Sequence, residues 1–240
     1  MKDQMIFQRY EFKYLLTRSQ LRTVLLAAKP HIVPDAYSHS SIRNIYLDTP
    51  DFRLIRRSLE KPVYKEKVRL RSYGTAEAGD SVFVELKKKY RSVVYKRRLS
   101  MEREQAMACV FGKNPWPDTQ IGQELAYAMN FYGDLRPAVF LSYERDAYQG
   151  IEDPQLRMTF DSRILYRRQG LSLGAEPWGV PLLGADQVLM ELKVAGGLPL
   201  WLARVLSSQG IYKTSFSKYG AAYQDKPEQY RGLGRTVRGG

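Results

Sequence analysis

Charged and apolar residues alternate in several short segments of this chain, and most of the charged positions are basic. In the segment VRLR, Arg69 and Arg71 share one parity while Val68 and Leu70 share the other. The same alternation recurs in VELKKK, VYKRR, YERDAY, LRMTFD and MELK. Because successive side chains of a β-strand point to opposite faces of a sheet, these segments predict strands with one ionic and one apolar face.

The pattern predicts an α+β arrangement built on antiparallel sheet. We expect about eight strands, at 7–15, 41–48, 63–73, 81–90, 92–101, 138–148, 156–166 and 188–194. Apolar residues at helical spacing predict helices at 19–29, after Pro50, near 102–111 and 121–132, after Pro199, and a short turn at 216–224. Thr17 is suited to cap the first helix.

A strand with an ionic face is ordinarily a strand whose ionic face meets water. Here basic residues recur on nearly every strand, and a flat surface of that kind would repel itself. We therefore expect a closed antiparallel β-barrel that forms a tunnel with a basic interior, flanked by helices. Such a tunnel would attract phosphate chains, and with about eight strands it would be too narrow for double-stranded nucleic acid.

Carboxylates are interleaved with these bases at Glu11, Glu85, Asp161 and Glu191. Magnesium and manganese take one or two carboxylates together with substrate phosphates, so such a sparse set suits a metal bound jointly with a triphosphate. Alternatively, each carboxylate pairs with a neighbouring base and keeps the tunnel folded. The residues leave both open, with Glu191 the strongest metal candidate.

Composition narrows the partners and the compartment. A formal net charge of +13 indicates an anionic partner. Cys109 is the only cysteine, which excludes an intramolecular disulfide, and short apolar runs with a charged start predict neither a membrane span nor a signal peptide. We expect a cytoplasmic protein, and we assign no chemistry to His31 or His39.

The motifs RYEFKY, VRLR, VELKKK, VYKRR, YERDAY, LRMTFD, MELK and FSKY together resemble the VTC domain, the polyphosphate polymerase branch of the CYTH-like triphosphate tunnel metalloenzymes. The resemblance runs from about Arg9 to Tyr223, so we expect one domain over 1–225 and a disordered Gly/Arg-rich tail over 226–240. Phosphate-binding, catalytic bases are implied at Lys13, Arg69, Arg71, Lys87, Lys96, Arg145 and Arg157. Further substrate-binding residues are implied at Glu11, Tyr143, Lys193, Lys213, Ser217 and Lys218. Glu191 of MELK matches the glutamate that binds Mn²⁺ or Mg²⁺.

One position departs from the CYTH triphosphatases, which open with Glu-x-Glu-x-Lys. Here Arg9 replaces the first glutamate, and Glu11 and Lys13 remain. A base in that place removes a possible metal ligand and adds affinity for phosphate, which favours the polymerase branch.

The sequence thus predicts a metal-dependent phosphotransferase that moves the γ-phosphoryl group of ATP, or of another nucleoside triphosphate, to inorganic polyphosphate. A hydrolase of tripolyphosphate or nucleoside triphosphates would use the same tunnel. A non-catalytic module that binds polyphosphate or single-stranded RNA is a third hypothesis. It requires aromatic residues in phase with the bases, whereas Tyr10, Phe12 and Tyr14 have the opposite parity to Lys13.

Overall fold

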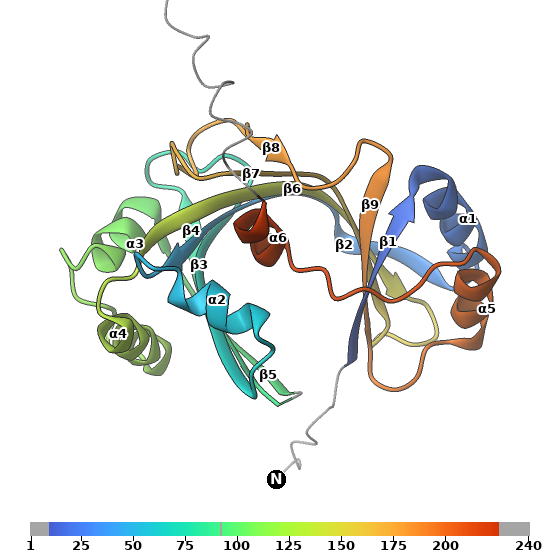
Figure 1. Ribbon diagram of the computed structural model, residues 1–240, viewed down its shortest axis with the longest axis horizontal. Helices are drawn as coiled ribbons and strands as arrows, with labels where there is room; N and C mark the ends of the chain where they lie inside the picture. Colours follow the sequence, from blue (N-terminus) through green and yellow to red (C-terminus); the bar gives the residue numbers. More distant parts are fainter. Residues whose placement is uncertain (1–9, 92, 226–240) are drawn as a thin grey trace, which may run out of the picture.

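The computed structural model describes residues 10–91 and 93–225. They form one antiparallel nine-stranded sheet with the order β1-β9-β7-β6-β2-β3-β4-β5, and the short β8 pairs with β7 (Figure 1). The strands are β1 (Tyr10–Thr17), β2 (Ile32–Asp48), β3 (Tyr64–Tyr73), β4 (Ser81–Tyr90), β5 (Val93–Glu102), β6 (Arg136–Gly150), β7 (Arg157–Arg167), β8 (Val180–Pro181) and β9 (Gln187–Val194). The helices are α1 (Arg18–Ala28), α2 (Arg53–Leu59), α3 (Arg103–Val110), α4 (Gln120–Tyr132), α5 (Leu200–Ser208) and α6 (Lys218–Gln224).

Most of the predicted elements are confirmed, and local chemistry explains their ends. Thr17 caps α1 through a reciprocal pair of bonds, because its hydroxyl accepts from the Gln20 amide while its own amide donates to the Gln20 side chain. The strand expected at 41–48 is longer, since β2 begins at Ile32 and pairs with β6 on both sides of an irregularity between Pro34 and His39. The predicted tail at 226–240 lies outside the described residues.

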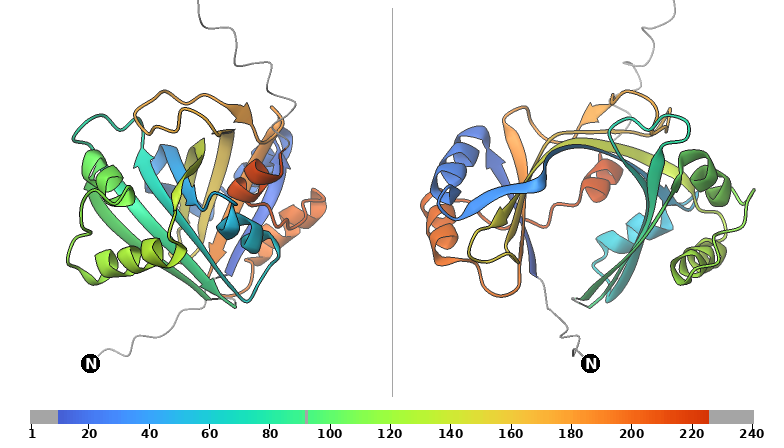
Figure 2. Two further views of the ribbon diagram at one scale, coloured as in Figure 1. Left: turned by 60° about the vertical axis from the view of Figure 1, so that its left-hand side comes forward. Right: turned by 180° about the vertical axis from the view of Figure 1, so that it is seen from behind.

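The sheet bends into an arch, with β2 and β6 along its top, β3 to β5 on one side, and β9 and β1 on the other (Figures 1 and 2). The antiparallel α+β sheet is as expected, but the closed barrel is not: in the described part of the chain, the strand order ends at β1 and β5 without a pairing between them. The outer edge of β1 is instead taken by the segment before α6. Tyr14 forms a β-bridge with Lys213, and the Thr214 amide donates to the Lys13 carbonyl at 2.7 Å.

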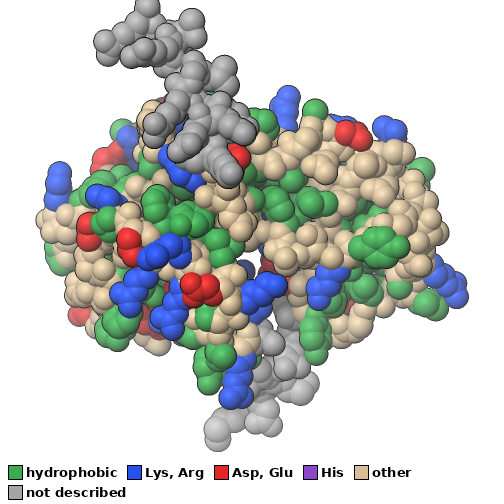
Figure 3. All heavy atoms as spheres, in the orientation of Figure 1, with side chains coloured by type: hydrophobic (Ala, Val, Ile, Leu, Met, Phe, Trp, Pro, Cys, Tyr) green, Lys and Arg blue, Asp and Glu red, His purple; other side chains and the backbone are tan. Residues whose placement is uncertain are grey.

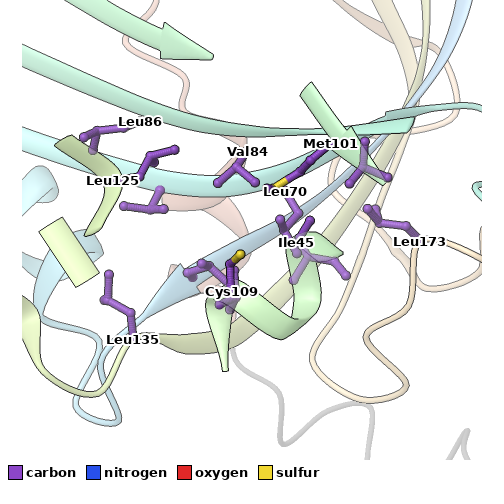
Figure 4. Close-up of a cluster of buried hydrophobic side chains, with 14 of the residues drawn as sticks. Ile45, Leu70, Val84, Leu86, Met101, Cys109, Leu125, Leu135 and Leu173 are labelled. Carbon is purple, nitrogen blue, oxygen red and sulfur yellow. The ribbon is translucent and has the colours of Figure 1, made fainter. Parts of the chain in front are cut away.

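Two apolar clusters lie on the convex side of the arch. One packs β3, β4 and β5 against α3 and α4, and it buries Cys109 among leucines and valines (Figure 4). The other packs β1, β7 and β9 against α1 and α5. These clusters use the apolar parity of the strands, so the opposite, ionic parity faces the concave side.

A third cluster lies on the concave side and corrects the expectation of a wholly ionic interior. There β2 and β6 present Tyr46, Leu141 and other apolar side chains to α2 and α6, which sit under the arch (Figure 2). Tyr219 of α6 is buried in this cluster. The helix is thereby fixed with its N-terminal residues directed at the ionic side chains. None of the helices in the described ranges has the length and apolarity to cross a membrane.

Candidate functional site: a basic concave face

The charged parity of seven strands converges under the arch, together with the start of α6. Arg69 lies opposite Glu85 in the β3–β4 register, Lys87 opposite Lys96 in β4–β5, and Lys13 opposite Glu191 in β1–β9. We define the concave face by the charged and polar side chains that meet there: Glu11, Lys13, Asn44, Tyr46, Lys67, Arg69, Arg71, Glu85, Lys87, Lys96, Arg98, Tyr143, Arg145, Asp161, Glu191, Lys193, Ser217 and Lys218. Bases clearly outnumber carboxylates in this set.

Glu85 anchors the β3–β5 side of the concave face. Only 1% of its side chain is exposed, and it lies 2.7 Å from the Lys96 ammonium, 2.6 Å from an Arg98 nitrogen and 2.6 Å from an Arg69 nitrogen. Burial by itself raises the pKa of Glu85, but the charges of Arg69 and Arg71 and the Lys96 bond outweigh it and hold that pKa well below the usual range. One buried carboxylate thus fixes several cations.

Glu191 plays the same part on the β9–β1 side. Its Oε1 lies 3.2 Å from the Lys13 ammonium and 3.1 Å from that of Lys218, and its Oε2 lies 3.3 Å from Arg145. Arg145 also donates two hydrogen bonds to Asp161, from Nε to Oδ1 at 2.6 Å and from Nη2 to Oδ2 at 2.7 Å. Burial alone would raise the pKa of Glu191, but the charges of Lys218, Lys13 and Arg145 have a larger effect in the opposite direction. The pKa of Glu191 is therefore held well below its ordinary value.

Tyr143 joins the two sides. Its hydroxyl accepts from Arg71 at 3.2 Å, and its ring faces the Lys218 ammonium at 4.6 Å and the Arg145 guanidinium at 5.3 Å. The side chain is nearly fully buried. The Glu85 and Glu191 groups therefore form one continuous surface through Tyr143 rather than two separate clusters.

Tyr46 and Lys67 lie beside Arg69 and have strongly shifted acidities. Tyr46 accepts from Arg69 at 2.9 Å, and although burial raises its pKa, the charges of Arg69 and Lys67 lower it to about 8. Burial lowers the pKa of Lys67 to about 8, and its ammonium donates to the Ser217 hydroxyl at 3.0 Å. The Lys67 ammonium is thus buried beside a neutral hydroxyl, and a bound anion would stabilise its charged form.

Glu11 links the β1 end of the sheet to β4. Its carboxylate lies 3.4 Å from Lys13 and 3.8 Å from Lys87, so a side chain of β1 meets a side chain of β4. Lys193 stands opposite Glu11 in the register, and burial lowers the pKa of Lys193. A side-chain ion pair thus joins β1 to β4, although within the described residues no backbone pairing joins β1 to β5.

Comparison with protein families supplies the observation that decides the identity of the fold: the model of the VTC domain matches residues 8–225. The chain belongs to the VTC domain family. This confirms the resemblance predicted from the motifs. A comparison with curated proteins found no match.

Solved structures with a similar fold include one described as a "putative adenylate cyclase" from Bacillus halodurans, at 13% identity and a TM-score of 0.52 over 93% of this chain and 99% of that chain. Another, at 15% identity and a TM-score of 0.49, is described as a "putative adenylyl cyclase" from Hippeastrum with a dominant triphosphatase activity, and it covers 90% of this chain and 97% of that chain. The first likeness shows that the VTC domain shares its fold with that protein.

The predicted site residues of this VTC domain are mostly brought together. One is not. Lys213 lies on the convex side of β1, with its ammonium 4.7 Å from the Phe12 ring centroid. The reason is that its bridge partner Tyr14 belongs to the apolar cluster packed against α1 and α5. Arg157 lies on the concave parity of β7, opposite Lys193, where it is half-exposed and pairs with Asp35 at 2.8 Å. The predicted contribution of Arg9 lies outside the described residues.

Some residues of the concave face were not singled out as site candidates. Arg98 and Lys67 share the parity of Lys96 and Arg69, so the alternation already marked them. Tyr46 and Asn44 lie in the apolar-looking segment IRNIYLD, and nothing in its composition indicates that they contact Arg69 and Arg71. Those contacts depend on the β2–β3 pairing.

The donor set of the VTC domain fits a divalent metal only if phosphate completes the coordination. Within residues 10–91 and 93–225, there is no group of three or more His, Cys, Asp or Glu side chains that could hold an ion alone. Glu191 is the carboxylate on which the ammonium groups of Lys13 and Lys218 converge, so it would accept a metal ion once phosphate oxygens draw those ammonium groups away. Magnesium and manganese bound through one carboxylate and phosphate oxygens suit this arrangement.

Proposed function

We propose that this VTC domain is a polyphosphate polymerase-like phosphotransferase that uses ATP or another nucleoside triphosphate. The observation that carries the proposal is the continuous concave face, on which Lys and Arg side chains outnumber carboxylates and are fixed in place by Glu85 and Glu191. Lys and Arg side chains also gather on the outer surface near α2 and β3–β5 (Figure 3). A field of this sign attracts polyphosphate and steers it toward the arch.

The chemistry asks little of any single side chain. Phosphoryl transfer proceeds through a loose transition state whose charge is spread over the equatorial oxygens, so positioning and electrostatic stabilisation supply most of the catalysis. We assign Arg69, Arg71 and Arg145 to the transferring phosphates, because guanidinium groups bind phosphate oxygens in a fixed, forked geometry. Lys13, Lys87, Lys96, Lys193 and Lys218 would hold neighbouring phosphates.

Glu191 would hold the metal ion, Mn²⁺ or Mg²⁺. When bound, the ion would neutralise charge on the phosphate oxygens that it contacts. Tyr143 and Ser217 would line the path of the chain. Lys213 stays peripheral in this proposal, since its ammonium lies against Phe12 on the convex side. Arg157 would bind phosphate beside Lys193 in exchange for its pair with Asp35.

The arrangement favours phosphate over water as the acceptor. In the proposed reaction a terminal oxygen of the chain forms a bond to the γ-phosphorus, the bond to the β–γ bridging oxygen breaks, and the nucleoside diphosphate leaves with that electron pair. A terminal phosphate oxygen is already ionised, whereas attack by water releases a proton that a base must accept. The carboxylates gathered here are each paired with two or more cations: Glu11, Glu85, Asp161 and Glu191.

The same surface could serve a triphosphatase, and product analysis separates the two activities. The purified chain is incubated with ATP and Mn²⁺, and the products are sized by gel electrophoresis while free phosphate is measured. The proposal predicts acid-labile polyphosphate that is absent with Glu191→Ala and Arg69→Ala, and retained with Lys88→Met, whose side chain lies on the convex face beside Glu124. Free phosphate without polymer would establish the hydrolase instead.

A non-catalytic RNA-binding module is less well supported. On β1 the aromatic residues face away from the bases, since Tyr14 lies in the outer core and Phe12 packs against it from the same side. Stacking of successive bases requires accessible aromatic side chains along the binding surface, whereas Tyr46 and Tyr143 of the concave face are buried. Salt-sensitive RNA binding by a chain that forms no polymer and releases no phosphate from ATP would favour this function.

The buried free thiol of Cys109 supports a reducing, cytoplasmic setting.

A further inference from the structure

Two aromatic rings extend the concave face beyond its last bases. Tyr73 and Phe83 share the parity of Arg71 and Glu85 in the β3 and β4 strands, and their rings meet edge to face with centroids 5.8 Å apart. Tyr73 keeps 49% of its surface exposed, although the ring stands beside buried ionic groups. The Tyr73 ring therefore offers an accessible surface next to the phosphate-binding groups.

Arg98 ties these rings to the phosphate-binding groups. Its guanidinium carbon lies 4.4 Å from the Phe83 ring centroid, its Nη2 donates to the Tyr73 hydroxyl at 3.2 Å, and its Nε donates to Glu85 at 2.7 Å. The same guanidinium therefore contacts an aromatic ring, a hydroxyl and the buried carboxylate. A phosphate held at Arg98 would lie next to the exposed side of Tyr73.

From this juxtaposition we infer that Tyr73, held in place by Phe83 and Arg98, forms a stacking platform for the nucleobase of the triphosphate donor. The inference deepens the proposed function and rests on it, because it identifies the donor as a nucleotide rather than inorganic polyphosphate. Aromatic rings stack on any base through its π-face, so the platform selects nucleotides without selecting one base. We expect purine triphosphates to bind more tightly than pyrimidine triphosphates, since their rings cover more of the tyrosine.

A structural role for Tyr73 predicts a different result. If the tyrosine served only to orient Arg98 through its hydroxyl, its loss would weaken binding of every phosphate ligand alike. If it is a platform, its loss weakens binding of nucleotides only, and removal of the hydroxyl alone has little effect. The two ligands ATP and tripolyphosphate distinguish these roles because both carry three phosphates and only ATP has a base.

The test is calorimetric titration of the full chain with ATP and with tripolyphosphate, in parallel and in the presence of Mg²⁺. We expect Tyr73→Ala to weaken ATP binding about tenfold and to leave tripolyphosphate binding within about twofold. Tyr73→Phe should bind both as the unmodified chain does. The matched control is Tyr95→Ala: Tyr95 is 50% exposed and lies on the neighbouring β5, but it faces the convex side opposite Lys88.

Each outcome decides the inference. Selective loss of ATP binding in Tyr73→Ala supports the platform. Equal loss for both ligands, or no loss for either, overturns it and leaves the proposed phosphate-binding surface intact. Absence of binding of both ligands to the unmodified chain would instead overturn the proposed function itself.

Discussion

The Tyr219 hydroxyl donates to Oδ2 of Asp48 at 2.7 Å, and both side chains are buried. The same carboxylate accepts from the backbone amides of Leu54 and Ile55 in the first turn of α2. A single aspartate thus joins the end of β2, the start of α2 and α6. Since Lys218 immediately precedes Tyr219, this bond also positions one of the cations that contact Glu191.

Tyr219→Phe should therefore destabilise the fold and weaken phosphate binding together. Losing a buried hydrogen bond to a charged acceptor costs about 1–3 kcal/mol of unfolding free energy. Chemical denaturation measures the stability, and calorimetry measures the affinity for tripolyphosphate. Tyr212→Phe is the control, because that tyrosine is 83% exposed and should change neither quantity. Unchanged stability in Tyr219→Phe would contradict the anchoring role of Asp48.

Glu85→Gln should lower the stability of the fold strongly and raise its affinity for tripolyphosphate. Removing the buried carboxylate leaves Arg69 and Arg98 without their common partner, which costs about 3–5 kcal/mol. A phosphate group should then replace the missing negative charge. Tripolyphosphate should therefore bind the variant more tightly than it binds the unmodified chain, and it should raise the melting temperature of the variant by more than that of the unmodified chain.

The matched control for Glu85 is Glu124→Gln on the convex side, where the carboxylate pairs with Lys88 and Arg97 at a more exposed position. An exposed pair contributes at most about 1 kcal/mol. Equal destabilisation by the two substitutions would show that Glu85 does not anchor the concave face.

Tyr46 should ionise near neutral pH. Its pKa of about 8 is below the usual value of 10.0, so the phenolate forms as the pH rises through 8 in the folded chain. Its contribution to stability is accordingly present above the unfolded pKa and is lost as the pH falls through 8. The difference in ultraviolet absorbance between the unmodified chain and Tyr46→Phe should show a midpoint near pH 8.

Bound tripolyphosphate should raise that midpoint, because its negative charge competes for Arg69 and Lys67 and disfavours the phenolate. A midpoint at 10 or above without ligand would mean that Arg69 and Lys67 do not surround this hydroxyl as the structure has them.

The alternation of charge predicted the face on which each base lies, but not how the faces are enclosed. Lys13, Lys87 and Lys96 could be assigned to one surface because strand parity is a local property of the backbone. The expected closure into a barrel was not found, and the segment that covers the edge of β1 could not be predicted, since Lys213 and Thr214 lie about two hundred residues from their partners in β1.

The apolar cluster on the concave side could not be predicted from the sequence pattern either. Val139 and Leu141 of β6 are compatible with either face of a sheet, and only the position of α6 shows that they are covered from below the arch. The position of Lys213 could not be predicted for a related reason: the resemblance implied a substrate-binding residue, whereas the β-bridge to Tyr14 puts Lys213 on the convex side.

The central claim is that the concave face, rather than the net charge of the chain, binds polyphosphate. Lys87 and Lys88 test it directly, because they are adjacent in β4 and point to opposite faces: Lys87 meets Glu11 under the arch, and Lys88 meets Glu124 outside it. Lys87→Met and Lys88→Met remove the same charge, and their affinities for tripolyphosphate can be compared by calorimetry at a fixed salt concentration. We predict a loss of about tenfold for Lys87→Met and a change within about twofold for Lys88→Met. Equal losses in the two variants would contradict the account.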